Sequence, residues 1–134
     1  MATMNNGIIH LFSTKSVHDV LQHLLSILAE KGITVFAVID HSGEAAKAGM
    51  EMKETKLVVF GNPKSGTPIM IAAPDCALDL PLKILIAEDA DGTTRVSYNS
   101  PAYLQTRYEL PSELIANIAV IEKIAAAISQ KAAS

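Results

Sequence analysis

The small number of long helices constrains this chain more than any other feature of its sequence. Apolar side chains recur at helical spacing over a long stretch in only two segments, residues 17–28 and 114–128. About five short segments are instead typical of strands, namely residues 7–13, 33–39, 55–61, 82–88 and 94–98. Parallel neighbours need a crossover connection, usually a helix, so two long helices are too few for a fully parallel sheet. The sequence therefore predicts a two-layer α+β fold, with a mainly antiparallel sheet and both long helices on one face.

The first long helix has clear boundaries in the sequence. Its apolar stripe consists of Val17, Val20, Leu21, Leu24, Leu25 and Leu28. This spacing puts the apolar side chains on one face, which is directed toward a core. Ser16 is a typical N-cap residue, and Gly32 stands where a glycine commonly ends a helix. We expect a helix that begins after Ser16 and ends before Gly32.

The strand segments predict that both faces of the sheet are covered. In residues 33–39 and 56–60 both alternating faces are apolar, whereas a sheet face in water is usually polar. One set is Phe36, Val38, Val58 and Phe60, and the other is Val35, Ile39, Leu57 and Val59. Only one set can face the two long helices. Because exposed apolar patches mark interfaces and two-fold dimers are the commonest assemblies, we expect a homodimer. In the alternative, the short helices expected near residues 42–49 and 67–73 fold over the sheet and close a monomer core.

Composition narrows the class of protein. A chain of 134 residues, 49% of them hydrophobic, is expected to form a single domain, 1–134, with its own core. The net charge of -3 offers no attraction for nucleic acid or an anionic membrane. No apolar run approaches the roughly 20 residues that span a bilayer, and residues 1–12 do not resemble a signal peptide. Cys76 has no partner for an internal disulfide, so we expect a soluble, cytoplasmic protein.

The stretch FGNPKSGTPIM, residues 60–70, has part of a phosphate-binding motif. Gly61 and Gly66 have the spacing of the two P-loop glycines and follow a strand-like segment. The motif then requires Lys and a Ser/Thr hydroxyl, but Thr67 and Pro68 stand at those positions. Without the lysine and the magnesium-binding hydroxyl, the sequence does not predict nucleotide hydrolysis.

The same stretch predicts a short helix with a different binding capacity. Thr67 is a possible N-cap, because Pro68 suits the first helical position, and the helix would run to about Ala73. The N–H groups at a helix start attract anions, and Lys64 lies close by in the sequence. We therefore expect any carboxylate or phosphate site at Gly66 and Thr67, beside Lys64. In the simpler interpretation, this segment is only a turn between a strand and a helix.

Two further residues carry functional chemistry. His41 follows Asp40 at the end of a strand-like segment, where side chains often serve binding or catalysis. Asp79 precedes Leu80 and Pro81 and is suited to bond local backbone. If the fold brings Asp79 to His41, the carboxylate would orient the imidazole. No second metal ligand accompanies His41 at a useful spacing, so no metal site is predicted; in the simpler interpretation His41 caps or packs locally.

Three stretches together resemble the bacterial and archaeal family called Domain of Unknown Function 302. They are VIDHSGEAAKAG, LVVFGNPKSGTPIM and ALDLPLKILIAEDADGTTRVSYNSP, and they cover most of residues 33–108 in the order of the family. The positions that match its hallmarks are Asp40, His41, Gly61, Asn62, Pro63, Asp79, Leu80 and Pro81. The resemblance implies a two-layer α+β fold similar to the TATA-binding-protein class, without its DNA-binding role. No catalytic residue can be carried over from the family, and the cofactors stay unknown.

Three hypotheses for function follow. In the first, the chain is a small domain that binds a small ligand where loops at the strand ends come together. An anion is one possible ligand of this kind. The residues of this candidate site are His41, Asn62, Lys64, Gly66, Thr67 and Asp79. In the second, the chain is an enzyme in which His41 is a general base or metal ligand oriented by Asp79. In the third, it is a structural or interaction module, and the same residues only shape turns.

Overall fold

A five-stranded antiparallel sheet forms the centre of the protein. The computed structural model describes residues 6–129, and the strands lie in the order β1-β5-β4-β3-β2 with every neighbouring pair antiparallel. The strands are β1 (Ile8–Ser13), β2 (Thr34–Asp40), β3 (Thr55–Gly61), β4 (Leu82–Glu88) and β5 (Thr94–Asn99). Each of them falls on a segment that the sequence predicts as a strand, so the antiparallel prediction is confirmed.

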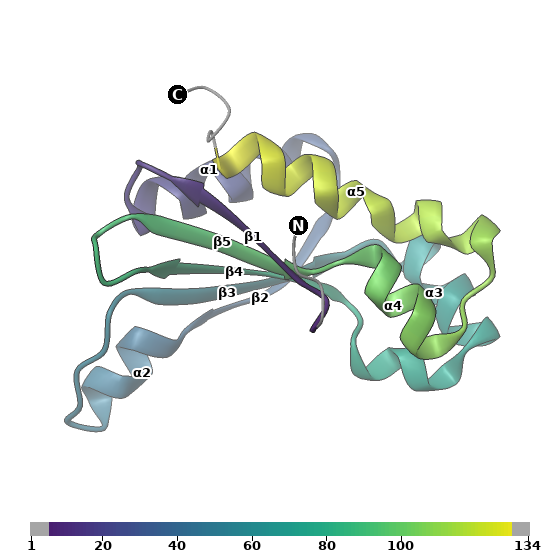
Figure 1. Cartoon of the computed structure of the whole chain (residues 1–134), viewed down its shortest axis with the longest axis horizontal. Helices are drawn as coiled ribbons and strands as arrows, with labels where there is room; N and C mark the ends of the chain where they lie inside the picture. The colour runs from purple at the N-terminus through teal and green to yellow at the C-terminus, as the bar shows by residue number, and fades with distance from the viewer. Residues whose placement is uncertain (1–5, 130–134) are drawn as a thin grey trace.

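The two long helices form the second layer. The helices are α1 (Val17–Glu30), α2 (His41–Lys47), α3 (Pro63–Ala72), the 3₁₀ helix η1 (Pro74–Leu78), α4 (Pro101–Tyr108) and α5 (Ser112–Ser129). Helices α1 and α5 contact each other and lie on the same face of the sheet (Figure 1). The predicted two-layer α+β architecture is therefore confirmed.

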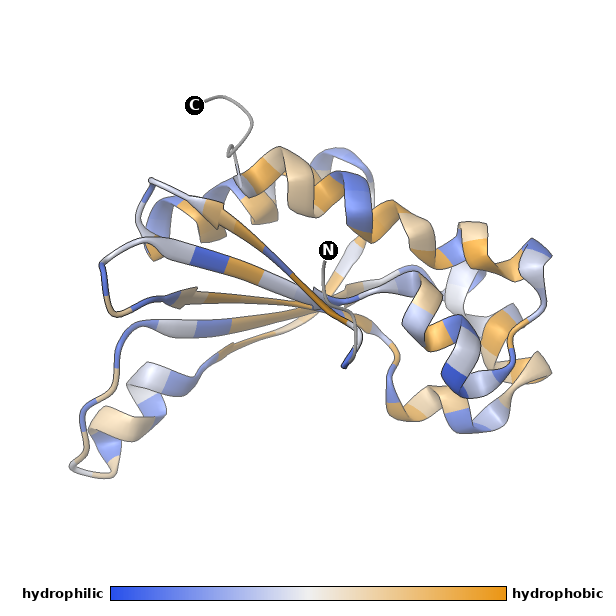
Figure 2. Cartoon of the chain, in the orientation of Figure 1, coloured by the Kyte–Doolittle hydropathy of each residue, from blue (hydrophilic) through white to orange (hydrophobic). Residues whose placement is uncertain are grey.

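The core lies between this helix pair and the sheet. Helix α1 has the predicted boundaries: the Ser16 hydroxyl accepts a hydrogen bond from the Asp19 N–H at 3.0 Å, and Gly32 has a φ of 69°. The apolar stripe of α1 is buried except for Leu25, which is half-buried against the core. Side chains of α5 and of the facing strands are buried with it, including Ile118, Ile121, Ile124, Val58, Phe60, Ile84, Ile86 and Val96. Figure 2 shows hydrophobic residues along much of the strands and on both long helices.

The edge strand β2 leaves apolar side chains in contact with water. It pairs only with β3 among the described strands, and its four large side chains are 37–51% exposed. They are Val35, Phe36, Val38 and Ile39. Helix α2 lies near one end of the sheet and α3, η1 and α4 lie near the other (Figure 1). Helix α3 packs on α5 and η1, and the four large side chains of β2 stay exposed.

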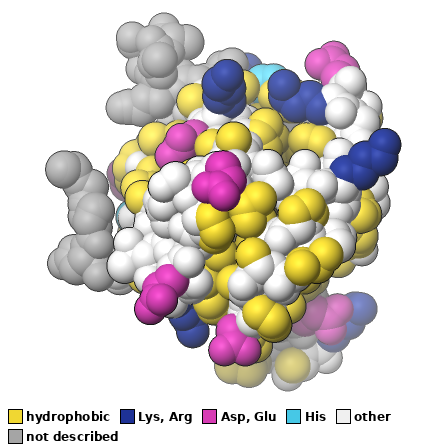
Figure 3. Space-filling model, turned by 90° about the vertical axis from the view of Figure 1, so that its right-hand side faces the viewer, with side chains coloured by type: hydrophobic (Ala, Val, Ile, Leu, Met, Phe, Trp, Pro, Cys, Tyr) yellow, Lys and Arg dark blue, Asp and Glu magenta, His cyan; other side chains and the backbone are white. Residues whose placement is uncertain are grey.

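A second apolar surface lies at the end of the molecule formed by α3, η1 and α4. Ile71 of α3 is 75% exposed and Leu78 of η1 is 74% exposed, the highest values among the large apolar side chains of the described residues. Figure 3 shows apolar side chains gathered on this end of the molecule. Large apolar side chains are therefore exposed both along β2 and at this end of the molecule.

Helix α3 begins earlier than the sequence predicts. Its N-cap is Asn62, whose side-chain oxygen accepts a hydrogen bond from the Lys64 N–H at 2.9 Å, and Pro63 occupies the first turn. Thr67 and Pro68 lie inside the helix, so the assignment of Thr67 as N-cap is wrong. Asn62 followed by Pro63 offers the same cap-and-proline chemistry as Thr67 followed by Pro68, and the chain uses the earlier pair.

Two further helices are not anticipated in the sequence analysis. Helix α4 begins with the same kind of signal: the Ser100 hydroxyl accepts a hydrogen bond from the Tyr103 N–H at 2.9 Å, and Pro101 follows the cap. Helix η1 is only five residues long and begins at Pro74. These two helices and α3 contact one another or α5, and together they build the end of the molecule that holds the cavity described below.

Candidate functional site

The candidate site residues lie at two opposite ends of the sheet. Strands β2 and β3 are antiparallel, with Thr34 opposite Gly61 and Asp40 opposite Lys56. His41 follows the end of β2, whereas Asn62 follows the end of β3, so the two residues are separated by the length of the strands. Six residues at about 3.3 Å each make this separation roughly 20 Å. The expectation that His41 shares a pocket with Asn62 and Lys64 is therefore wrong.

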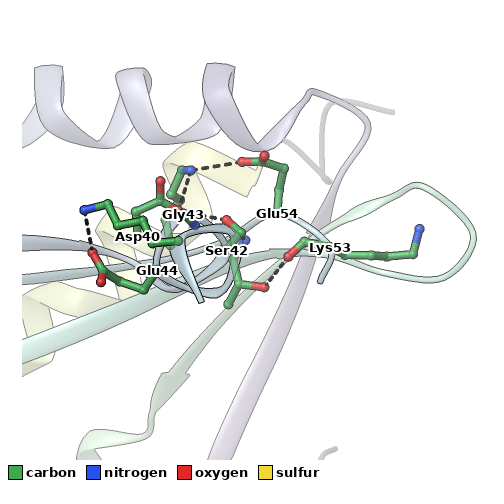
Figure 4. Close-up of polar contacts among 9 residues, drawn as sticks. Asp40, Ser42, Gly43, Glu44, Lys53 and Glu54 are labelled. Atoms are coloured by element: carbon green, nitrogen blue, oxygen red, sulfur yellow. Dashed lines mark hydrogen bonds and ion pairs between the residues drawn. The ribbon is translucent and has the colours of Figure 1, made fainter. Parts of the chain in front are cut away.

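At the His41 end, the neighbouring Asp40 holds α2 in place. Its carboxylate accepts hydrogen bonds from the Gly43 N–H at 2.9 Å and the Ser42 hydroxyl at 2.8 Å. Lys56 of β3 lies 2.9 Å from the same carboxylate and also pairs with Glu54 at 3.0 Å. Figure 4 shows these polar contacts converging at the start of α2. The cluster ties a helix without any buried residue to the sheet.

The charges in this cluster shift two pKa values. The hydrogen bond from Lys56, helped by those from Gly43 and Ser42, holds the pKa of Asp40 well below its usual range. Asp40 in turn raises the pKa of Lys56. A Cβ added at Gly43 would overlap the Asp40 carboxylate, so a larger residue there would displace this hydrogen-bonded side chain. The stretch DHSG thus has a structural explanation that does not involve His41.

Asp79 has partners other than His41. Its carboxylate accepts hydrogen bonds from the Tyr108 hydroxyl and, at 3.0 Å, from Arg107 Nη1. The bond to Asp79 raises the pKa of Tyr108 to about 12, because losing the hydroxyl proton would remove this bond. Asp79 lies close to the start of β4, where Leu82 pairs with Phe60, at the opposite end of the sheet from His41. The proposed pairing of Asp79 with His41 is therefore wrong.

A cavity of about 160 Å³ lies where β3 meets α3, at the Asn62 end of the sheet. Its apolar side chains come from four parts of the chain: Phe36, Pro63, Met70, Leu80, Pro81, Leu82 and Ile118. Its other lining residues are Gly61, Asn62, Ser65, Gly66, Thr67 and Asn117. Asn62 and Thr67 are exposed and Phe36 is 51% exposed, so the cavity reaches the surface.

Three of the six candidate residues line this cavity: Asn62, Gly66 and Thr67. Lys64, His41 and Asp79 do not. A Cβ added at Gly66 would approach only the Met70 methyl group, at 4.0 Å, so the space beside this glycine is open. Because α3 begins at Asn62, the expected anion site at a helix start beside Thr67 is wrong.

Helix α5 contributes a polar residue that sequence reasoning missed. The Asn117 side-chain amide donates a hydrogen bond to the Ser65 carbonyl at 3.0 Å and so joins α5 to α3. Asn117 is half-buried and lines the cavity. An amide beside Ile118, within the apolar stretch between Glu113 and Glu122, is the signal that could have identified it. Among residues 6–129, no group of three or more His, Cys, Asp and Glu side chains is arranged to hold a metal ion.

The antiparallel sheet and the two long helices on one of its faces define a two-layer α+β domain. The model of the family "Domain of unknown function DUF302" matches residues 9–130, and the chain belongs to that family. A solved DUF302 protein from Bacillus stearothermophilus has a TM-score of 0.76 and 17% sequence identity, covering 93% of this chain and 97% of that one. The likeness to the TATA-binding-protein class stays a prediction.

Curated relatives of the chain are longer proteins. The Fluoride-specific ion channel FluC 1 of Brucella suis biovar 1 is 33% identical over 107 residues, which cover 80% of this chain and 42% of the relative. FluC 1 of Brucella abortus biovar 1 has the same identity over 107 residues, which cover 40% of its length. The match thus spans less than half of these relatives. In residues 6–129 we find no helix with the length and apolar character of a membrane span.

Proposed function

We propose that the chain is a binding domain for a small, mainly apolar molecule, which occupies the cavity between β3, α3 and α5. The volume and lining of this cavity are the observations that carry the proposal. At about 160 Å³ it is close in size to the engineered apolar cavity of about 150 Å³ that binds benzene. Seven apolar residues supply contact area, and the Thr67 hydroxyl and two amides are available to orient a polar group.

Binding suits this cavity better than catalysis. The side chains that line it are apolar, hydroxyl or amide groups, with no carboxyl, imidazole or thiol among them, whereas general acid–base chemistry needs a group that titrates. His41 lies at the other end of the sheet, and Asp79 is engaged by Tyr108 and Arg107. The enzyme hypothesis requires Asp79 to orient His41, and the two residues lie at opposite ends of the sheet.

Filling the cavity tests the binding proposal. Gly66→Leu adds a side chain next to Met70, and Ala72→Leu adds the same side chain at an exposed position of α3 that does not line the cavity. We expect benzene-sized probes such as phenol to shift the backbone amide NMR signals of residues 61–70 in the wild type and in Ala72→Leu. Gly66→Leu should abolish these shifts. Equal shifts in all three proteins would refute binding in this cavity.

We also propose a two-fold homodimer through the edge of β2. The support is chemical: Val35, Phe36, Val38 and Ile39 are exposed on a strand whose outer edge has no partner among the described strands. Between Thr34 and Ile39 the strand has no charged residue and no proline, two of the devices that keep an edge strand monomeric, although its register against β3 shifts between Val35 and Ala37. Two copies of β2 can pair antiparallel without bringing like charges together.

The names of the curated relatives support a third proposal, that the domain works alongside a membrane protein. Proteins named as fluoride channels match this chain over less than half of their length. The cavity itself is a poor fluoride site, because its lining is mainly apolar and holds no cationic side chain. Fluoride should therefore leave the amide signals of residues 61–70 unchanged, whereas fluoride-dependent shifts there would contradict the assignment of the cavity to an apolar ligand.

For the cellular setting, we propose the cytoplasm, with no nucleic acid as partner. Cys76 is a buried free thiol, as expected in a reducing compartment. The net charge of -3 gives no electrostatic attraction for a phosphate backbone. Fractionation of cells that express the chain tests the cytoplasmic location. The protein of each fraction is unfolded and Cys76 is labelled with a thiol-reactive reagent. Labelled protein in a fraction from outside the cell membrane would contradict the proposal.

A further inference from the structure

We propose that the natural ligand of the cavity is a small amphipathic acid, with its apolar part in the cavity and its carboxylate at Lys31. This inference rests on the binding function proposed above and names the chemical class of the ligand. It also assigns a role to a residue that sequence reasoning did not consider.

A second hollow, of about 430 Å³, adjoins the cavity. The two share five lining residues, Gly61, Asn62, Ser65, Leu82 and Asn117. The second hollow extends from these residues toward the segment between α1 and β2, where it is lined by Lys31 and Ile33. A molecule bound in the cavity therefore has room to extend past Asn62 and Asn117 toward Lys31.

Lys31 is the only charged side chain that lines either space. Its backbone is held at the end of α1, where its N–H donates to the Ile27 carbonyl at 3.0 Å. Its side chain is exposed and forms no ion pair with any residue between 6 and 129. One unpaired ammonium beside an apolar cavity suits a ligand with one negative charge.

The shared residues add hydrogen-bond donors between the two spaces. Asn62 uses its side-chain oxygen to cap α3, which leaves its NH₂ group as a donor. That NH₂ group makes no hydrogen bond within the described part of the chain. A carboxylate accepts up to four hydrogen bonds, so it is better matched to an ammonium and an amide NH₂ than a neutral carbonyl is.

The volume of the cavity sets the apolar part of the ligand. A space of about 160 Å³ holds a benzene ring or a branched aliphatic group of similar size. The chemical class is therefore an aryl or branched aliphatic carboxylic acid. A phosphate ester is a poorer match, because a dianion would meet a single lysine.

Two matched probes and two matched variants test the proposal. Phenylacetate has the ring and the charge, and phenylacetamide has the same shape without the charge. Lys31→Gln removes the only cation of the site, whereas Lys64→Gln removes a nearby exposed lysine that lines neither space. Dissociation constants come from the amide NMR shifts of residues 61–66 during titration at pH 7.

We expect the wild type and Lys64→Gln to bind phenylacetate about three-fold more tightly than phenylacetamide, as for one exposed ion pair. In Lys31→Gln the two probes should bind equally. Equal binding of both probes by the wild type, or a preference for phenylacetate that survives in Lys31→Gln, would overturn the role of Lys31 and leave the cavity proposal standing. Failure of both probes to bind the wild type would count against the cavity proposal itself.

Discussion

The start of α3 gives the sharpest test of the structure, because two residues compete for the role of N-cap. The Asn62 side-chain oxygen accepts the Lys64 N–H at 2.9 Å, whereas Thr67 lies inside the helix. Replacing an N-cap by alanine removes this bond and costs about 1 kcal/mol. Replacing an exposed threonine inside a helix by alanine improves helix propensity and stabilises by up to about 0.7 kcal/mol. Asn62→Ala and Thr67→Ala should therefore change the free energy of unfolding in opposite directions.

For a chain of 134 residues, a loss of about 1 kcal/mol lowers Tm by roughly 3 to 5 °C. Thermal unfolding followed by circular dichroism measures this difference directly. Asn62→Asp is the matched control, since aspartate keeps a capping oxygen and should retain most of the stability. A drop in Tm for Thr67→Ala that equals or exceeds the drop for Asn62→Ala would refute the assignment and restore Thr67 as the cap.

Three further predictions concern the two polar clusters and the β2 edge. The folded-state pKa of Asp40 is lowered, so its carboxylate stabilises the fold above the unfolded-state pKa of about 4, and this stabilisation is lost as pH falls further. The difference in free energy of unfolding between the wild type and Asp40→Asn, measured by urea denaturation, should therefore shrink below about pH 4. The folded-state pKa of Tyr108 is raised to about 12, so the wild type should lose stability between pH 10 and 12. Tyr108→Phe should lose less over this range, with the remaining loss coming from Tyr98 and Lys56, whose pKa values are also raised; identical profiles would contradict the bond to Asp79. Sedimentation of the wild type at micromolar concentration should give twice the 14.3 kDa chain mass. Val38→Lys at the β2 edge should be a monomer, whereas the control Ile71→Lys should stay a dimer; a wild-type monomer would refute the dimer.

Much of the fold was predictable from local sequence patterns. The stripe of α1, with Ser16 before it and Gly32 after it, identifies the helix and both of its ends. The shortage of crossover helices indicates an antiparallel sheet, because parallel neighbours cannot be joined by short turns. The pairing of Ser100 with Pro101 carries the signal for α4, although the sequence analysis did not use it.

The separation of His41 from Asn62 was also within reach of the sequence. Both residues follow strands that are consecutive in the chain, and two antiparallel neighbours finish at opposite ends of the strands. The start of α3 is different, because Asn62–Pro63 and Thr67–Pro68 carry the same local signal. The fold selects the earlier start, and long-range contacts at this helix include Asn117 of α5, which binds the Ser65 carbonyl.

Only the tertiary structure determines the candidate site. The cavity combines Phe36 of β2, residues 61–70, residues 80–82 and two residues of α5, and the adjoining hollow brings in Lys31. Local patterns report which face of an element is apolar, since they depend on residues a few positions apart. A cavity depends on how the ends of several elements, far apart in the sequence, fail to fill the space between them. That space is set by packing across the whole domain, and no local pattern encodes it.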